Sequence, residues 1–319
     1  MSVSMNSVFS GGWKNIKNNP ILFVPNILSI VFSAVLYAAF LIGFIAIAAV
    51  FGVAGYNYFN YDYLFSTAGL ENAGFGIVCL IFLTIFAIIV ICSLVSSYVQ
   101  AGLIGMSQDA AKTGFTKISS LFSYGNKYFL RVFAISILMA IVIFLPIVLI
   151  CLIFILSIMF LSGLSVILGI LLLGVVLIGF IAMFVYIIAV SIYFYFVSYA
   201  AVIDNTPVFA SFRKSVRLIN ENKSDVIVFF LLIFAISIVI GIISSILSMI
   251  SAITLLGSIL YYLFYIFTGI FVSTFITVWG TRMYLTLTGN ECFCGCLGDE
   301  AADCSENENC GKQNTDMDS

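Results

Sequence analysis

Four long stretches without a single charged residue constrain the fold of this chain more than any other feature. A helix needs about 20 apolar residues to cross the hydrocarbon layer of a bilayer, and each stretch exceeds that length. They do not alternate apolar with polar residues, as the strands of a membrane β-barrel do. Only 8% of the residues are charged, too few to cover a soluble domain. The sequence predicts an all-α integral membrane protein whose spans lie within Lys17–Asp62, Glu71–Asp109, Arg131–Asp204 and Asp225–Arg282.

The distribution of Lys and Arg predicts the number of spans and their orientation. The segments Ser107–Lys127 and Asp204–Asp225 are both basic, so both are expected on the cytoplasmic side of the cell membrane. Two segments on one side require an even number of crossings between them. The third and fourth charge-free runs therefore hold two helices each, turning near Ser162–Ser165 and Ser251–Gly257. The first two runs hold one helix each, which predicts six transmembrane helices with both termini cytoplasmic.

Three similar stretches precede the odd-numbered spans. Each mixes apolar, basic and small residues and ends in Asn. They predict three helical hairpins, each preceded by a short interfacial amphipathic helix, and the stretches are Phe9–Asn19, Thr116–Asn126 and Phe212–Asn222.

The third of these stretches has the clearest helical pattern. Thr206 is a candidate N-cap, and Pro207 suits the first helical position. Apolar residues recur on one face, namely Phe209, Phe212, Val216 and Ile219, whereas the other face carries Arg213, Lys214, Arg217 and Glu221. One interpretation places Arg213, Lys214 and Arg217 among anionic lipid headgroups. The alternative is a cytoplasmic connector packed on the helical bundle.

Small residues line one side of the fifth span at helical spacing. Because small residues let transmembrane backbones approach closely, this side is expected to pack against another helix. A polar transport path is the alternative for these residues, Ser237, Gly241, Ser244, Ser248 and Ser251. A cluster of Tyr and Phe in residues 56–63 is interpreted as an interfacial aromatic belt on the outer side.

Several kinds of catalytic and transport chemistry lack their usual residues. The chain contains no His, no G-x-S-x-G elbow and no P-loop. The predicted spans contain no Asp, Glu, Lys or Arg, which ion-coupled transporters and proton relays usually keep inside the membrane. We therefore expect no enzyme, no ion-coupled pump and no nucleic-acid partner; the expected partners are membrane lipid and other membrane proteins.

The composition changes after the last span, which divides the chain into a membrane domain, residues 1–288, and an acidic, cysteine-rich cytoplasmic tail, residues 289–319. From Glu291 onwards the tail has eight acidic residues against one base, Lys312, a composition typical of disorder. Its five cysteines suggest a Zn²⁺ site, although their spacing differs from that of zinc ribbons. Reduced thiols without a ligand and lipid attachment near the membrane are the alternatives for Cys292, Cys294, Cys296, Cys304 and Cys310. No other cofactor is expected.

The stretch SYAAVIDNTPVFASFRKSVRLINENKSDVIVFFLLIF, Ser198–Phe234, resembles a family of six-span membrane proteins of unknown activity. This family is similar to the membrane domain that precedes the catalytic domain of some glycerophosphodiester phosphodiesterases. The matching residues are Ala210, Ser211, Ser215, Leu218 and Asn222-Lys223, and the resemblance extends over about residues 1–288. The phosphodiesterase catalytic domain is missing, and its active site needs His. The resemblance implies the fold and the membrane location, but not hydrolase activity.

Three functions remain open on the sequence alone. The leading hypothesis is a non-enzymatic scaffold or accessory component that acts through lipid or protein contacts. A permease for small neutral or lipid-like cargo is the second, with the small-residue side of the fifth span lining its path. The third makes the cysteine-rich tail a metal-responsive regulator of either activity.

Overall fold

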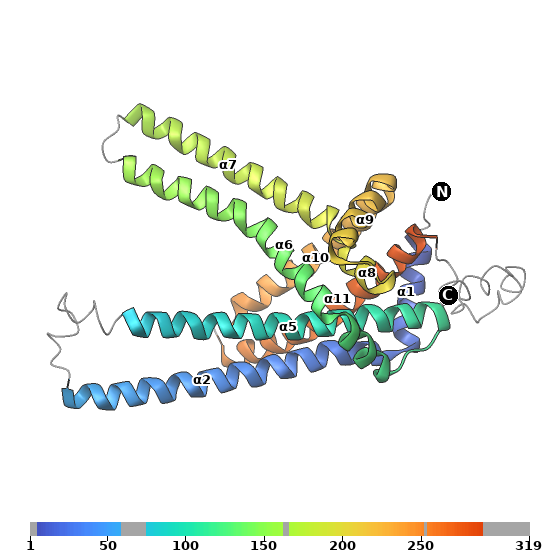
Figure 1. The fold of residues 1–319 in the computed structure, drawn as a ribbon, viewed down its shortest axis with the longest axis horizontal. Helices are drawn as coiled ribbons and strands as arrows, with labels where there is room; N and C mark the ends of the chain where they lie inside the picture. Colours follow the sequence, from blue (N-terminus) through green and yellow to red (C-terminus); the bar gives the residue numbers. More distant parts are fainter. Residues whose placement is uncertain (1–4, 59–74, 162–165, 252–253, 290–319) are drawn as a thin grey trace, which may run out of the picture.

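A computed structural model describes residues 5–58, 75–161, 166–251 and 254–289 of the chain, and every element in these ranges is helical (Figure 1). Within these ranges, six helices are long and apolar enough to cross a membrane, as predicted. The protein is a multi-pass, all-α membrane protein. Its elements are α1 (Met5–Asn18), η1 (Pro20–Phe23), α2 (Val24–Tyr58), α5 (Phe75–Thr113), α6 (Ile118–Leu161), α7 (Val166–Tyr193), α8 (Val197–Ile203), α9 (Val208–Glu221), α10 (Lys223–Ser251) and α11 (Leu255–Leu287).

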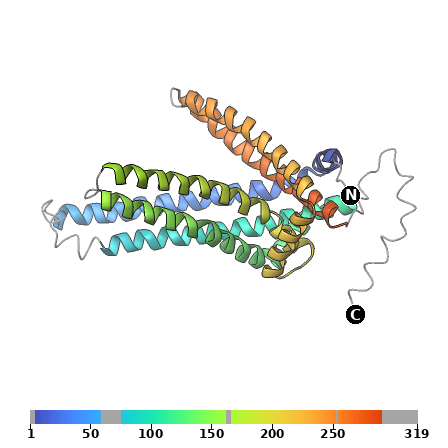
Figure 2. The same cartoon turned by 90° about the horizontal axis from the view of Figure 1, so that it is seen from above.

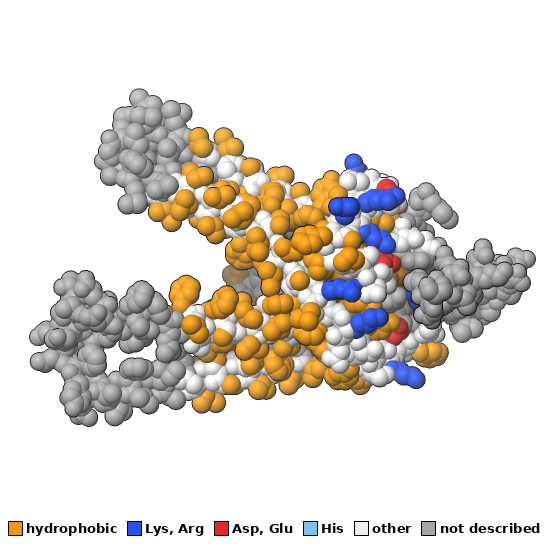
Figure 3. Space-filling view, viewed as in Figure 1, with side chains coloured by type: hydrophobic (Ala, Val, Ile, Leu, Met, Phe, Trp, Pro, Cys, Tyr) orange, Lys and Arg blue, Asp and Glu red, His pale blue; other side chains and the backbone are white. Residues whose placement is uncertain are grey.

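The long helices form three hairpins that diverge from a common base. The pair α6–α7 diverges from α2–α5 in Figure 1, and the pair α10–α11 diverges from both of these in the perpendicular view of Figure 2. The short helices α1, α8 and α9 lie at the base, together with the α5–α6 connection and the last turns of α11 (Figure 1). We call this base the basic end, because Lys and Arg side chains form a band across it (Figure 3). α1 and the end of α11 therefore lie at the same end of the molecule.

The predicted introductory helices are present, but one is not separate. α1 and α9 are independent helices, whereas the second stretch forms the first turns of α6. Pro20 follows Asn19 and cannot continue the hydrogen bonding of α1. α9 ends before Asn222, whose φ of −128° and ψ of 42° lie outside the helical region. At Asn126 there is no such break, and α6 continues through it.

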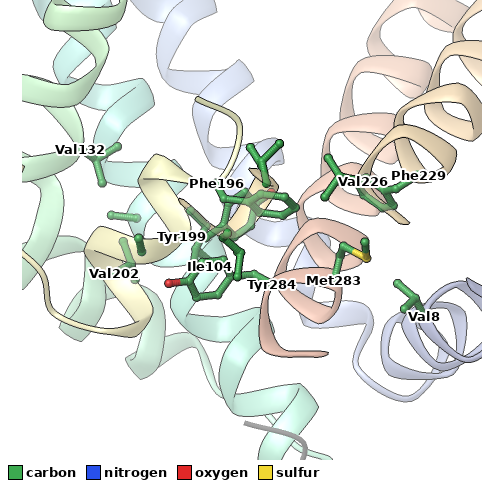
Figure 4. Packing of buried hydrophobic residues seen from close by; sticks show 14 of the residues in the cluster. Val8, Ile104, Val132, Phe196, Tyr199, Val202, Val226, Phe229, Met283 and Tyr284 are labelled. Carbon is green, nitrogen blue, oxygen red and sulfur yellow. The ribbon is translucent and has the colours of Figure 1, made fainter. Parts of the chain in front are cut away.

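The packed core lies at the basic end rather than along the hairpins. Phe196, just before α8, and Tyr199, in α8, pack against Tyr284 of α11, and Phe229 of α10 belongs to the same cluster (Figure 4). Val8 of α1 joins the same cluster. The core thus joins all three hairpins at one end.

Glycines bring the helices of the basic end close together. A methyl group added at Gly105 of α5 would overlap the Tyr124 ring of α6, and one at Gly280 of α11 would overlap Tyr199. Such positions accept only glycine unless the neighbouring rings move.

Beyond the base, the helices expose large apolar side chains on most sides (Figure 3). Exposed residues of this kind occur along α2, α5, α6, α7, α10 and α11. Lipid tails are a suitable environment for such a surface, and water is not.

The small-residue side of α10 packs less closely than predicted. Its ends adjoin α11: Ser251 O accepts a hydrogen bond from Ser258 Oγ at 2.9 Å, and Ser237 lines a cavity of about 80 Å³ beside Phe275 and Trp279. A Cβ atom at Gly241 would find no atom within 4 Å. The close helix approach expected for this side therefore does not occur at Gly241.

Candidate functional site

The centre of the basic end is a junction at Asp204, where α9 and α11 converge on the end of α8. Tyr284 of α11 donates a hydrogen bond from its hydroxyl to Asp204 Oδ2. Lys214 of α9 places its Nζ 2.9 Å from the same oxygen. The Asp204 side chain is 17% exposed and that of Lys214 is 38% exposed. One carboxylate therefore connects α8, α9 and α11.

The next residue connects this junction to the second hairpin. Asn205 has a φ of 54°, a left-handed conformation that Asn adopts more readily than most residues. Arg131 of α6 donates from Nη1 to Asn205 Oδ1 at 2.7 Å and contacts the Thr206 carbonyl at 3.4 Å. Through the contacts of Asp204, Asn205 and Thr206, the helices α6, α9 and α11 all contact the short turn that follows α8.

Thr206 does not cap α9, contrary to the sequence prediction. Its hydroxyl donates to Ala200 O at 2.9 Å, at the end of α8, and lies 2.7 Å from Ser211 Oγ. Pro207 occupies the N-cap position instead. The ψ of 158° at Pro207 places the chain in an extended conformation, and the Thr206 side chain is directed back to the helix before it.

α9 packs on the bundle through small and aliphatic residues. The buried positions are Ser211, Ser215, Leu218 and Ile219, and Ser215 donates to Tyr193 O at 2.9 Å. The predicted apolar face of α9 is therefore only partly buried. Ile219 is buried, whereas Phe209 is 79% exposed. α9 is thus packed against the bundle, as the connector interpretation requires, and still presents an outer face.

The three predicted headgroup cations differ in their surroundings. Lys214 is held by Asp204. Arg217 is exposed and donates from Nε to Glu221 Oε1 at 2.8 Å, and this hydrogen bond together with the carboxylate charge raises the pKa of Arg217. Arg213 is exposed and has no partner among the described residues. Arg213 and Arg217 are therefore the two exposed cations of α9, whereas Lys214 is partly buried and held by Asp204.

Two grooves flank these arginines. The first, which we call the Phe194 groove, has a volume of about 590 Å³ and lies between α9 and Phe194. The second, the Leu287 groove, has a volume of about 510 Å³ and extends from α9 to Leu287 and Thr288 at the end of α11. Arg213, Arg217 and Glu221 line both grooves. The charged side chains shared by the two linings thus lie between the Phe194 groove and the Leu287 groove, which are both open and partly apolar.

Exposed aromatic rings accompany the bases at three places around the basic end. Trp13 of α1 is 59% exposed and lies next to Lys14, and Phe115 is 72% exposed between Lys112 and Lys117. Phe209 is one helical turn before Arg213 on α9. Large rings beside cations are typical of segments at a membrane–water interface.

Asn19 fixes the first of these segments against the second. Its Nδ2 donates to Gly114 O at 2.9 Å, and its Oδ1 accepts from the Thr116 amide at 3.1 Å. Sequence reasoning recognised Asn19 as the end of a repeat but missed this role. It also missed Asp204, Arg131 and Tyr284. The sequence contained one signal for the role of Asp204. It is an acidic residue that follows a long uncharged run and begins an otherwise basic segment.

The five predicted metal-ligating cysteines of the tail lie outside the described residues, as does the tyrosine cluster within residues 59–63. Among the described residues, no group of three or more His, Cys, Asp or Glu side chains is placed to hold a metal ion. Cys92 is half-buried in α5, and Cys151 is exposed on α6.

No family model, curated protein or solved structure matches this chain. The resemblance to the membrane domains of glycerophosphodiester phosphodiesterases therefore stays a prediction from the residues quoted for it.

Proposed function

We propose that this protein is a non-enzymatic scaffold or accessory component of the cell membrane that acts through contacts with anionic lipid at its basic end. The observation that carries this proposal is the arrangement of Arg213 and Arg217 on the exposed face of a helix that is itself packed on the bundle. These guanidinium groups face outward beside two grooves. Guanidinium groups pair well with the phosphate oxygens of lipid headgroups.

The aromatic residues support the same proposal. Trp13, Phe115 and Phe209 are exposed beside bases on three separate segments of the basic end. An aromatic ring at the headgroup level and a cation among the phosphates together hold a segment in the interface. Three such pairs, together with the apolar hairpins, would set the depth of the whole molecule in the bilayer.

The orientation follows from the positive-inside rule, which places the basic end and both termini in the cytoplasm. A cysteine-free variant with Lys117→Cys tests it, because Lys117 is exposed in the connection before α6. We expect a membrane-impermeant maleimide to label this cysteine only after the cells are opened. Labelling of intact cells would overturn the orientation.

The lipid contact is tested with the double variant Arg213→Gln, Arg217→Gln, in which Lys214 is left intact because it holds Asp204. Retention of phosphatidylglycerol against phosphatidylcholine by the detergent-purified protein is measured by native mass spectrometry. We expect the double variant to retain phosphatidylglycerol roughly tenfold less strongly at low salt. Unchanged selectivity would overturn the lipid contact.

Glu221→Gln provides a control of opposite sign on the same helix. It removes the carboxylate that pairs with Arg217, and the pair is exposed, so the fold is expected to remain intact. Selectivity for phosphatidylglycerol should then rise. A fall in both variants would mean that damage to α9, rather than its charge, controls lipid retention.

A further inference from the structure

The charge of this chain is divided sharply at the end of the described structure. Residues 1–290 contain eleven of the twelve Lys and Arg and six of the fourteen Asp and Glu, which gives a net charge of +5. Residues 291–319, which we call the acidic tail, contain the remaining eight acids and one base, a net charge of −7. The two parts of one polypeptide therefore attract each other.

The described structure ends beside the exposed arginines of α9, three residues or fewer before the acidic tail. Leu287 and Thr288 line the Leu287 groove together with Arg213 and Arg217. Thr288 ends α11, donating from its amide to Tyr284 O at 3.0 Å and from its hydroxyl to the same oxygen at 2.9 Å. Gly289 follows with a φ of 72°, a left-handed conformation that turns the chain out of the helix direction.

Geometry makes contact between the tail and this groove easy. The first acidic residue, Glu291, comes three positions after Thr288, which is already a wall of the groove. One extended residue spans about 3.3–3.6 Å, so the following acids reach the whole groove without strain. A short tether gives an effective concentration of the order of millimolar. Contacts too weak to hold a free peptide can therefore hold this one.

We propose that the acidic tail occupies the Leu287 groove, with its carboxylates on Arg213 and Arg217, and that it competes there with anionic lipid. The competition rests on the proposed lipid contact; the docking of the tail does not. Arg213 has no partner among the described residues, and Arg217 has only the exposed Glu221. The tail supplies carboxylates to both arginines, and its remaining negative charge repels anionic headgroups from the same surface.

Docking is tested in the full-length chain by disulfide trapping. Cys304, in the middle of the acidic tail, is kept, the other seven cysteines are replaced by Ala, and Ala210→Cys is added. Ala210 is exposed and lines the Leu287 groove. The matched control keeps Cys304 and carries Ser123→Cys, an exposed position on α6 outside this groove. The rate of intramolecular disulfide formation under mild oxidation is measured by mass spectrometry of peptides.

We expect the disulfide to form several-fold faster at position 210 than at position 123. Adding Arg213→Gln and Arg217→Gln, or raising the salt to about 1 M, should remove the difference, because both weaken exposed ion pairs. Equal rates at the two positions, or a difference that survives both treatments, would overturn the docking. This readout contains no lipid, so its failure leaves the lipid contact standing.

Competition is tested separately by replacing the eight acids of the tail with Asn and Gln in the otherwise unaltered chain. Retention of phosphatidylglycerol should rise several-fold over the unaltered protein. If the disulfide forms as expected and retention does not change, the tail docks without competing, and the regulatory half of the proposal is wrong. If neither chain prefers phosphatidylglycerol, the proposed lipid contact fails while the docking is still judged by its own measurement.

Discussion

The Asp204 junction leads to a sharp prediction about stability, because one carboxylate serves two donors from different helices. Replacing Asp204 with Asn preserves the size of the side chain and removes its charge. Asn can still accept a hydrogen bond from Tyr284, but it no longer forms an ion pair with Lys214, whose Nζ is 2.9 Å from Asp204 Oδ2. The variant therefore measures what the charge of Asp204, rather than the shape of its side chain, contributes to stability.

The expected loss follows from the exposure of each partner. Hydrogen bonds to charged groups contribute about 1.5–3 kcal/mol, against about 1 kcal/mol for neutral ones, so the bond from Tyr284 should weaken by about 1 kcal/mol. Lys214 is 38% exposed, so its ion pair is discounted towards the surface value of about 0–1 kcal/mol. Asp204→Asn should thus lower the free energy of unfolding by about 1–2 kcal/mol. Lys214→Met should lower this free energy by less than about 1 kcal/mol, because the Asp204 carboxylate still accepts the hydrogen bond from Tyr284.

Equilibrium unfolding in mixed micelles, followed by circular dichroism, measures both variants. Glu221→Gln serves as the control, because its pair with Arg217 is exposed and should leave stability unchanged. The reasoning predicts the order Asp204→Asn, then Lys214→Met, then Glu221→Gln, from most to least destabilising. A Lys214 variant that is as destabilised as the Asp204 variant would refute it, because the ion pair rather than the shared carboxylate would then hold the junction.

Two further predictions concern packing and hydrogen bonding at the basic end. Gly280→Ala forces a methyl group against the hydroxyl ends of Tyr199 and Tyr195 and should destabilise the protein by about 1–3 kcal/mol. Gly241→Ala meets no atom and should not destabilise it, as the same unfolding measurement would show. Asn19→Ala removes three hydrogen bonds and should cost about 2–3 kcal/mol, with faster hydrogen exchange at the Thr116 amide; the exposed Asn18→Ala is the control, and equal effects would contradict the assigned role.

The transmembrane architecture was predictable because it depends on local composition. Charge-free runs mark the spans, and the signs of the connecting segments require an even number of crossings between Lys127 and Arg213. The part of the chain that the structure describes contains the six long apolar helices that this argument requires. The boundary predicted after the second introductory stretch was wrong, because the similarity of that stretch to the other two does not show whether the helix is interrupted there.

The contacts of the basic end were not predictable, since their partners are far apart in the chain. Tyr284 is 80 residues from Asp204, and Arg131 is 74 residues from Asn205. Helical periodicity assigned Lys214 to the same outer face as Arg213, and it was correct about the side of the helix. It does not reveal that Asp204, from the turn before α9, lies within reach of Lys214 and not of Arg213.

The distribution of packing between the two parts of the molecule has a physical cause that bears on function. Lipid tails solvate Leu, Ile and Phe as well as another helix does, so apolar hairpins gain little by closing on one another inside a membrane. Close glycine contacts, shared carboxylates and buried amides do provide specific association, and in the described residues they gather at the basic end. Arg213 and Arg217 project from that rigid part of the molecule. A ligand that binds them therefore contacts a preorganised surface, and variants in the hairpins should affect it less than variants at Asp204.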